Sequence, residues 1–74
     1  MCLALPMVVN SIKKNLMAVG ETMGVKREIS ILLVPDVQTG EHVLVHAGMA
    51  IEKINRQEAE ERMIIFESML EESD

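Results

Sequence analysis

The chain has 74 residues, enough for one small domain that buries only about 60% of its unfolded surface. Hydrophobic residues make up 49% of it, but there is one Phe and no Tyr or Trp, so aliphatic side chains and seven Met must fill the core. A single Cys excludes an internal disulfide framework, and no apolar run reaches the roughly 20 residues of a membrane-spanning helix. Because nothing resembles a signal peptide, we expect a cytoplasmic protein without a membrane partner.

The net charge of −5 lies entirely in the last part of the chain. Residues 1–54 hold five acidic and five basic side chains, whereas residues 55–74 hold seven acidic and two basic ones. A barrel that binds nucleic acid needs a basic groove and stacking aromatic rings. This chain is acidic, and its only aromatic residue, Phe66, lies in the tail. We therefore expect no nucleic-acid partner.

Three strands are predicted in the first half of the chain. Residues 3–12 are mostly apolar and β-branched, which is typical of a strand that begins or kinks at Pro6. Polar residues then indicate a break and a turn, and residues 16–19 are a second short strand that Gly20 is expected to stop. Residues 25–34 are expected to form the longest strand, with one face in water at first and both faces buried toward its end.

Two further strands complete the predicted sheet. Residues 35–41 have the composition of a loop, and residues 42–47 and 49–54 are expected to be strands on either side of Gly48. Five short strands at this spacing predict a mainly β fold, a small OB-like antiparallel β-barrel over residues 1–54.

Residues 55–74 are predicted to form an acidic amphipathic C-terminal α-helix that belongs to the same structural domain. Asn55 can cap the helix, and Glu58, three residues later, completes a box-like N-terminal signature. An apolar stripe at helical spacing is expected to pack on the barrel; it consists of Ala59, Met63, Phe66 and Leu70.

The first six residues carry the most specific chemical signal. Removal of Met1 is expected before a small residue, and Cys2 would then hold an α-amino group with a pKa of about 7.7–8.0 beside a thiol near about 8.5. The ammonium favours the thiolate, which is both the nucleophile and the metal-binding form. Leu3 and Leu5 can hold the segment in place while Pro6 limits its flexibility. The alternative is a Cys that packs as a small buried hydrophobe, although residues at termini are seldom buried.

Cys2, His42 and His46 are the candidate metal ligands, together with the terminal amine. The two histidines are four residues apart in an expected strand, so they share a face with Leu44. Nothing in the spacing shows that the three groups converge. We favour a single thiolate that offers a metal ion half a site, completed by another protein. The alternative for His46 is an edge histidine hydrogen-bonded to the backbone, and His42 is expected at the surface.

Three segments in order give the chain a specific resemblance. The chain resembles the HypC/HupF family of hydrogenase maturation chaperones at Met-Cys-Leu-Ala-Leu-Pro (residues 1–6), Gly-Val-Lys-Arg-Glu-Ile-Ser (24–30) and Gly-Glu-His-Val-Leu-Val-His-Ala-Gly-Met-Ala (40–50). The similarity covers most of the chain, through the acidic tail. This sequence departs from the family pattern at three positions: Met7 stands where Gly is common, His42 where an aromatic residue is common, and Met49 where Phe is common.

The resemblance implies a chaperone, not an enzyme, in nickel–iron hydrogenase maturation. Such proteins associate with an iron–sulfur partner, HypD, while iron acquires cyanide and carbon monoxide, and then with the precursor of the hydrogenase large subunit. By this resemblance Cys2 is the iron ligand and the contact point for both partners, and His46 assists at the iron. Leu3, Leu5 and Pro6 would bind the partner together with Cys2. The iron group would be a transient cargo, with no permanent cofactor.

A thiol-dependent enzyme with Cys2 as its nucleophile is the alternative function. It requires a general base within hydrogen-bond reach, and only the α-amino group or a histidine could serve. No carboxylate, oxyanion loop or cofactor motif is recognisable around Cys2, so no catalytic residue is assigned.

Overall fold

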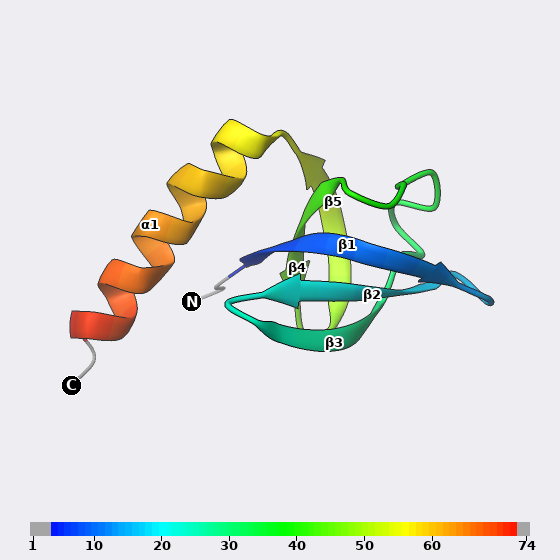
Figure 1. The fold of residues 1–74 in the computed structure, drawn as a ribbon, viewed down its shortest axis with the longest axis horizontal. Helices are drawn as coiled ribbons and strands as arrows, with labels where there is room; N and C mark the ends of the chain where they lie inside the picture. Colours follow the sequence, from blue (N-terminus) through cyan, green and yellow to red (C-terminus); the bar gives the residue numbers. More distant parts are fainter. Residues whose placement is uncertain (1–3, 73–74) are drawn as a thin grey trace.

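The computed structural model describes residues 4–72, with side chains up to residue 68. Its elements are, in chain order, β1 (Leu5–Lys13), β2 (Met17–Thr22), β3 (Val25–Ser30), β4 (His42–His46), β5 (Met49–Ile54) and α1 (Arg56–Glu72). The strands form a closed barrel in the order β1-β2-β3-β5-β4, and α1 extends away from one end of it (Figure 1). This architecture confirms the predicted mainly β, OB-like barrel with a C-terminal helix.

β1 is shared between the two sides of the barrel. Residues 5–8 pair with β4, and residues 8–13 pair with β2. A register shift at Asn10 lies within the second ladder, and Asn10 Nδ2 donates to Glu21 Oε1 at 2.7 Å. The polar residues 10–11 therefore mark a β-bulge inside a continuous strand, not the predicted break.

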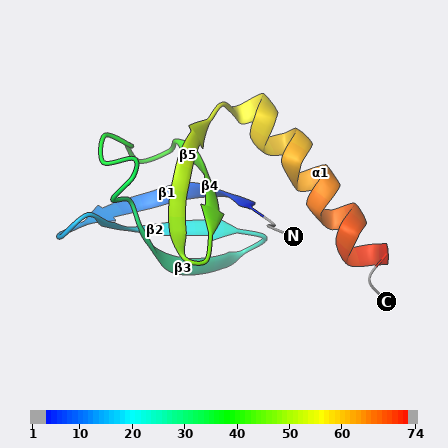
Figure 2. The same cartoon turned by 180° about the vertical axis from the view of Figure 1, so that it is seen from behind.

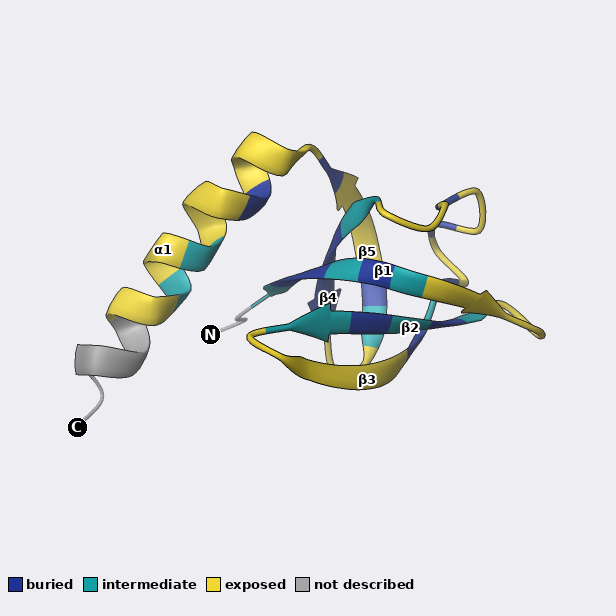
Figure 3. Cartoon of the chain, viewed as in Figure 1, coloured by how far each residue is buried: buried dark blue, intermediate teal, exposed yellow. Residues whose placement is uncertain are grey.

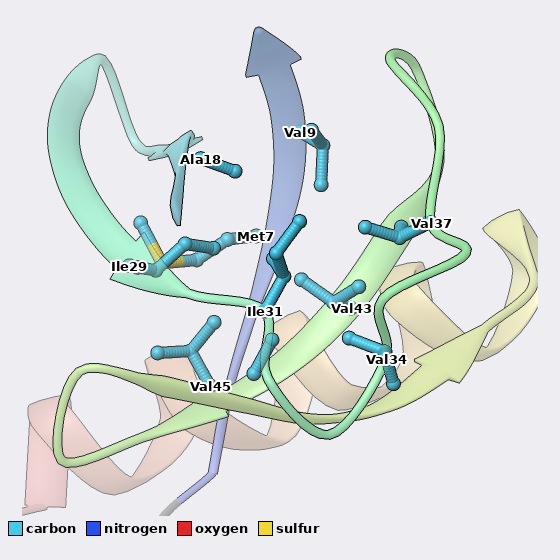
Figure 4. Close-up of a cluster of buried hydrophobic side chains, with 10 residues drawn as sticks. Met7, Val9, Ala18, Ile29, Ile31, Val34, Val37, Val43 and Val45 are labelled. Atoms are coloured by element: carbon cyan, nitrogen blue, oxygen red, sulfur yellow. The ribbon is translucent and has the colours of Figure 1, made fainter. Parts of the chain in front are cut away.

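Small and aliphatic side chains fill the barrel interior. They come from every strand and from the loop after β3, and the buried cluster consists of Met7, Val9, Ala18, Ile29, Ile31, Val34, Val37, Val43, Val45 and Ala50. Figure 4 shows most of these side chains converging on one centre. None of the buried residues in the described chain is polar or charged. With no aromatic ring in this cluster, the stability of the barrel depends on close packing among methyl and methylene groups.

The third predicted strand ends earlier than expected. β3 stops at Ser30, whose Oγ accepts a hydrogen bond from the Leu32 amide at 3.3 Å and so competes with strand pairing. Leu32 and Leu33 are 56% and 57% exposed, so their predicted burial is wrong. Val34 and Val37 instead turn back into the core from the loop. The prediction failed because a short apolar run has the same composition whether it forms a buried strand or a loop that places some of its side chains in the core.

Gly20 does not end the second strand, because β2 continues for two residues beyond it. The hairpin turn is made by Met23 and Gly24, with φ values of 50° and 77°, as a two-residue hairpin requires. A Cβ added at Gly20 would lie 3.1 Å from Ile29 Cδ1 and 3.3 Å from Met7 Cε. Gly20 therefore serves close packing in the core.

One ion pair joins the loop before β4 to β5. Lys53 Nζ donates to Asp36 Oδ2 at 3.0 Å. This hydrogen bond lowers the pKa of Asp36 below its ordinary value and raises the pKa of Lys53. Because the Asp36 pKa is lowered, any stabilisation is present at neutral pH and is lost as the pH falls through that pKa. The pair is exposed to solvent, so its contribution is small.

The start of α1 is anchored to the outside of the barrel. Leu44, Ile54 and Ala59 form a second buried cluster, against which Ala4 packs. This cluster connects the helix to β4, to the end of β5 and to the residue that precedes β1. The helix and the entry of the chain into the barrel are thus held by one set of contacts.

Burial along α1 decreases from Ala59 over the described side chains, which end at residue 68 (Figure 3). Met63 and Phe66 are half-buried, whereas Ile64 and Ile65 are 63% and 59% exposed. The predicted stripe thus faces the barrel as far as Phe66, and the side chain of Leu70 lies outside the described part. No helix in residues 4–72 is long and apolar enough to cross a membrane.

Gly20→Val is expected to lower the free energy of unfolding by about 1–3 kcal/mol, because the added methyl groups need space that Ile29 and Met7 occupy. Urea unfolding followed by far-ultraviolet circular dichroism measures this change. Val19→Ile adds one methylene to the other face of the same strand and should change the free energy by less than about 0.5 kcal/mol. Equal midpoints for Gly20→Val and the unmodified chain would contradict the close packing described here.

Asn55→Ala is expected to reduce the helical signal and to lower the free energy of unfolding by about 1 kcal/mol. Asn55 Oδ1 accepts from the Glu58 amide at 2.7 Å, and the Asn55 amide donates to Glu58 Oε1 at 3.3 Å, which completes a capping box. Circular dichroism and urea unfolding measure both effects. Asn55→Asp keeps an acceptor at the cap and is the matched control; a loss as large as that of Asn55→Ala would speak against this role.

Candidate functional site

The candidate site lies at the end of the barrel where the chain enters β1. The start of β1, the turn after β4 and the turn between β2 and β3 lie at this end, with α1 beside them (Figures 1 and 2). Of the predicted site residues, Leu5, Pro6 and His46 are described, whereas Cys2 and Leu3 lie outside residues 4–72. The structure therefore defines the platform from which the terminal residues start.

Leu5 and Pro6 are held by the ladder between β1 and β4, opposite Val45 and Leu44. Leu5 is half-buried and packs against the main core cluster, whereas Pro6 is buried. Residues 5–7 pair with β4 but not with β2, so Pro6 lies in a stretch with one ladder, which tolerates a residue without an N–H. Pro6 is thus part of the barrel wall, and Leu5 has the more accessible surface of the two.

His46 is the last residue of β4 and is exposed. It pairs with Met49 across a two-residue turn. The turn residues, Ala47 and Gly48, have φ values of 55° and 79°, the left-handed conformation of a tight hairpin. The end of β4 and the turn that follows it therefore lie at the same end of the barrel as the start of β1.

His42 is at the other end of β4, where it is half-buried and lines a hollow of about 200 Å³ beside α1. His42 and His46 do share the outward face of β4 with Leu44, because Val43 and Val45 point into the core. Four residues of strand separate the histidines by about 13 Å, too far for one metal ion. Within residues 4–72, no group of three or more His, Cys, Asp and Glu side chains could hold a metal.

An apolar cavity of about 540 Å³ opens beside Leu5. Its lining comes from β1, β2, β3, β4 and α1, and includes Met7, Val45, Gly48 and Phe66. The cavity thus extends from the start of β1 to the turn that follows His46. Its volume is in the range of about 300–1,000 Å³ that ligand-binding pockets occupy.

The sequence did not predict this cavity. Its walls include Phe66, which helical spacing assigned to packing on the barrel, together with Met7 and Met23. The one available signal was Arg27, which interrupts the apolar positions of β3 and also lines the cavity. Among the described residues, Arg27 forms no ion pair. A cation on an otherwise apolar face is costly unless it meets solvent or a partner.

Known proteins match this chain over most of its length. The HupF/HypC family model matches residues 1–66. Hydrogenase maturation factor HypC of Helicobacter hepaticus is 44% identical over 72 residues, which cover 96% of this chain and 84% of that protein. Hydrogenase maturation factor HypC of Cupriavidus necator is 38% identical over 66 residues, covering 89% and 73%. Frd operon uncharacterized protein C of Proteus vulgaris is 40% identical over 80 aligned positions, covering 100% and 83%. This chain therefore belongs to the HupF/HypC family.

Proposed function

We propose that this chain is a hydrogenase maturation factor that carries an iron–cyanide–carbonyl group and delivers it to the precursor of the hydrogenase large subunit. The family match, and relatives named as hydrogenase maturation factors, support a role in hydrogenase maturation. In this proposal the chain is a cytoplasmic chaperone, not an enzyme, and the iron group is its cargo.

The register between β1 and β4 is the observation that carries the proposal. Leu5 lies opposite Val45, so one further step of the same antiparallel register puts Ala4 opposite His46. Cys2 precedes Ala4 by two residues, and two residues span at most about 7 Å. The first described residue, Ala4, is thus close to the end of β4 that carries the exposed His46, which supports an iron site shared by Cys2 and His46.

The proposed chemistry needs one soft ligand at this end of the barrel. A Cys2 thiolate supplies it, and the α-amino group left by Met1 removal favours the thiolate form. His46 assists, either at the iron or by holding a group that contacts it. Because a single thiolate is half a site, another protein completes the coordination.

Two partners are proposed, a HypD-type iron–sulfur protein and the large-subunit precursor. Both bind the segment formed by Cys2, Leu3, Leu5 and Pro6. Leu5 supports this role because it borders an open apolar cavity, so a partner that covers it removes apolar surface from water. Since both partners need the same segment, they bind in succession.

Cys2→Ala is expected to fold normally but to lose the iron group and weaken both partner complexes, because no other soft ligand starts from the same point. Protein with its native N-terminus is purified from cells that assemble hydrogenase. Metal analysis and the infrared bands of cyanide and carbon monoxide should fall at least about tenfold, while circular dichroism stays unchanged. Ser11→Ala, at an exposed position elsewhere on β1, is the control. Undiminished cyanide and carbonyl bands in Cys2→Ala would sink the proposal.

An N-terminal tag that prevents Met1 removal is expected to abolish hydrogenase maturation and leave the fold intact. The tag removes the free α-amino group beside the thiol and occupies the space that the partner needs. Hydrogenase activity of cells that carry the tagged protein is the readout, and the same tag placed after Asp74 is the control. Full maturation with an uncleaved N-terminal tag would show that a processed terminus is not required.

A further inference from the structure

The barrel closes through a single bridge, which leaves part of one strand unpaired. β3 meets β5 only where Ser30 pairs with Met49, and the Ser30 amide donates to the Gly48 carbonyl at 2.9 Å. Residues 25–29 of β3 pair with β2 on one side and with no described strand on the other. Figure 3 shows most of this stretch as exposed. β3 therefore has a free edge over residues 25–29.

The backbone groups at this free edge belong to Lys26 and Glu28. The two-residue turn makes Thr22 and Val25 a hydrogen-bonded pair, and such pairs recur at every second residue of the ladder with β2. The intervening Lys26 and Glu28 therefore direct their N–H and C=O groups away from β2. Ser30, two residues after Glu28, follows the same alternation and bonds toward β5.

The same edge borders the apolar cavity. Val25, Arg27, Glu28 and Ile29 line the cavity from β3, and Leu5 and Phe66 line it from β1 and α1. Glu28 forms an ion pair with Lys13. Arg27 has no ion pair in the described part of the chain. Unpaired backbone donors and acceptors, an apolar cavity and an unpaired cation thus lie side by side.

We infer that the free edge of β3 and this cavity form one docking site for an extended acidic segment of a partner protein. The segment adds to β3 as a strand, places an aliphatic side chain in the cavity and sets a carboxylate against Arg27. In this binding mode main-chain hydrogen bonds supply affinity and side-chain pockets supply specificity. The inference rests on the proposed function in one respect, that the chain works by binding other proteins; it requires neither iron nor Cys2.

Charge favours a different protein over a second copy of this chain as the occupant. Two β3 edges that pair antiparallel, with Lys26 opposite Glu28, place the two Arg27 side chains directly opposite each other. Like charges at directly opposed positions destabilise a strand pair, whereas an acidic residue there stabilises it. Charged residues on a short edge also discourage indiscriminate strand pairing.

Nuclear magnetic resonance of the isotope-labelled full chain tests the inference. The probe is the capped peptide acetyl-Thr-Val-Thr-Leu-Thr-Asp-Thr-amide, whose Leu and Asp share one face of a strand. Millimolar peptide should cause saturable shifts of the Lys26 and Glu28 amide signals and slow their exchange with solvent. The same peptide with Lys in place of Asp should bind at least about fivefold more weakly, because it opposes Arg27 with a like charge.

Two variants separate the parts of the site. Arg27→Glu should reverse the preference and bind the Lys peptide more tightly than the Asp peptide. Lys26→Pro removes an N–H that faces the free edge, keeps the ladder with β2, and should abolish binding of both peptides. Cys2→Ala should bind the Asp peptide as the unmodified chain does, so failure of the iron-carrying role leaves this result unaffected.

Three outcomes would overturn the inference. The first is the absence of saturable shifts at Lys26 and Glu28 with the Asp peptide. The second is a dependence of these signals on protein concentration without peptide, which would assign the edge to a second copy of the chain. The third is tighter peptide binding by a chain that lacks residues 1–3, which would assign the cavity to the chain's own N-terminal segment.

Discussion

The candidate site of this molecule depends on the ladder between β1 and β4. That ladder is short, residues 5–8 of β1, yet it sets where the chain begins relative to His46 and to the cavity. Antiparallel pairing has no intermediate register, because a shift by one residue would turn every side chain of β1 to the opposite face. Met7 and Val9 would then leave the core, so the burial of two side chains fixes the position of the terminus.

The composition of the core explains why the barrel has a weakly closed side. Aliphatic side chains fill a narrow interior, and a loop supplies Val34 and Val37 where a longer β3 would otherwise continue. Because β3 ends at Ser30, it reaches β5 at only one residue pair. The unpaired edge over residues 25–29 has a different cause. β3 and β5 run parallel, so the partners of these residues would have to precede Met49, where the chain instead turns back into β4.

Sequence patterns predicted the parts of the fold that depend on local chemistry. Five strands, the capping box at Asn55 and the burial of Ala59 follow from alternation, helical spacing and side-chain hydrogen bonding. The end of β3 and the role of Gly20 did not follow, because each depends on a distant residue that the strand order brings close. The cavity was missed for the same reason. It joins five elements, and a local sequence pattern does not show which elements meet.

The first of the three segments that carry the family resemblance begins with Met1, Cys2 and Leu3, and the described structure begins directly after them. The family is thus recognisable from the sequence, whereas the cavity and the end of β4 near Leu5 could be located only from the fold. Ala4 follows the terminal residues directly and packs against the cluster that anchors α1. A displacement of α1 would therefore change the contacts of Ala4, the first described residue of the chain.

Phe66 is the only Phe, Tyr or Trp in the protein, and it forms part of the cavity wall, whereas neither histidine lines the cavity. Phe66 should therefore dominate the ring-current shifts of methyl groups inside the cavity. Leu5, Val25 and Val45 line the same cavity, so the chemical shifts of their methyl groups depend on the distance between α1 and the barrel. The chemical shifts of these methyl groups should therefore report on a change at the cavity when a partner binds there.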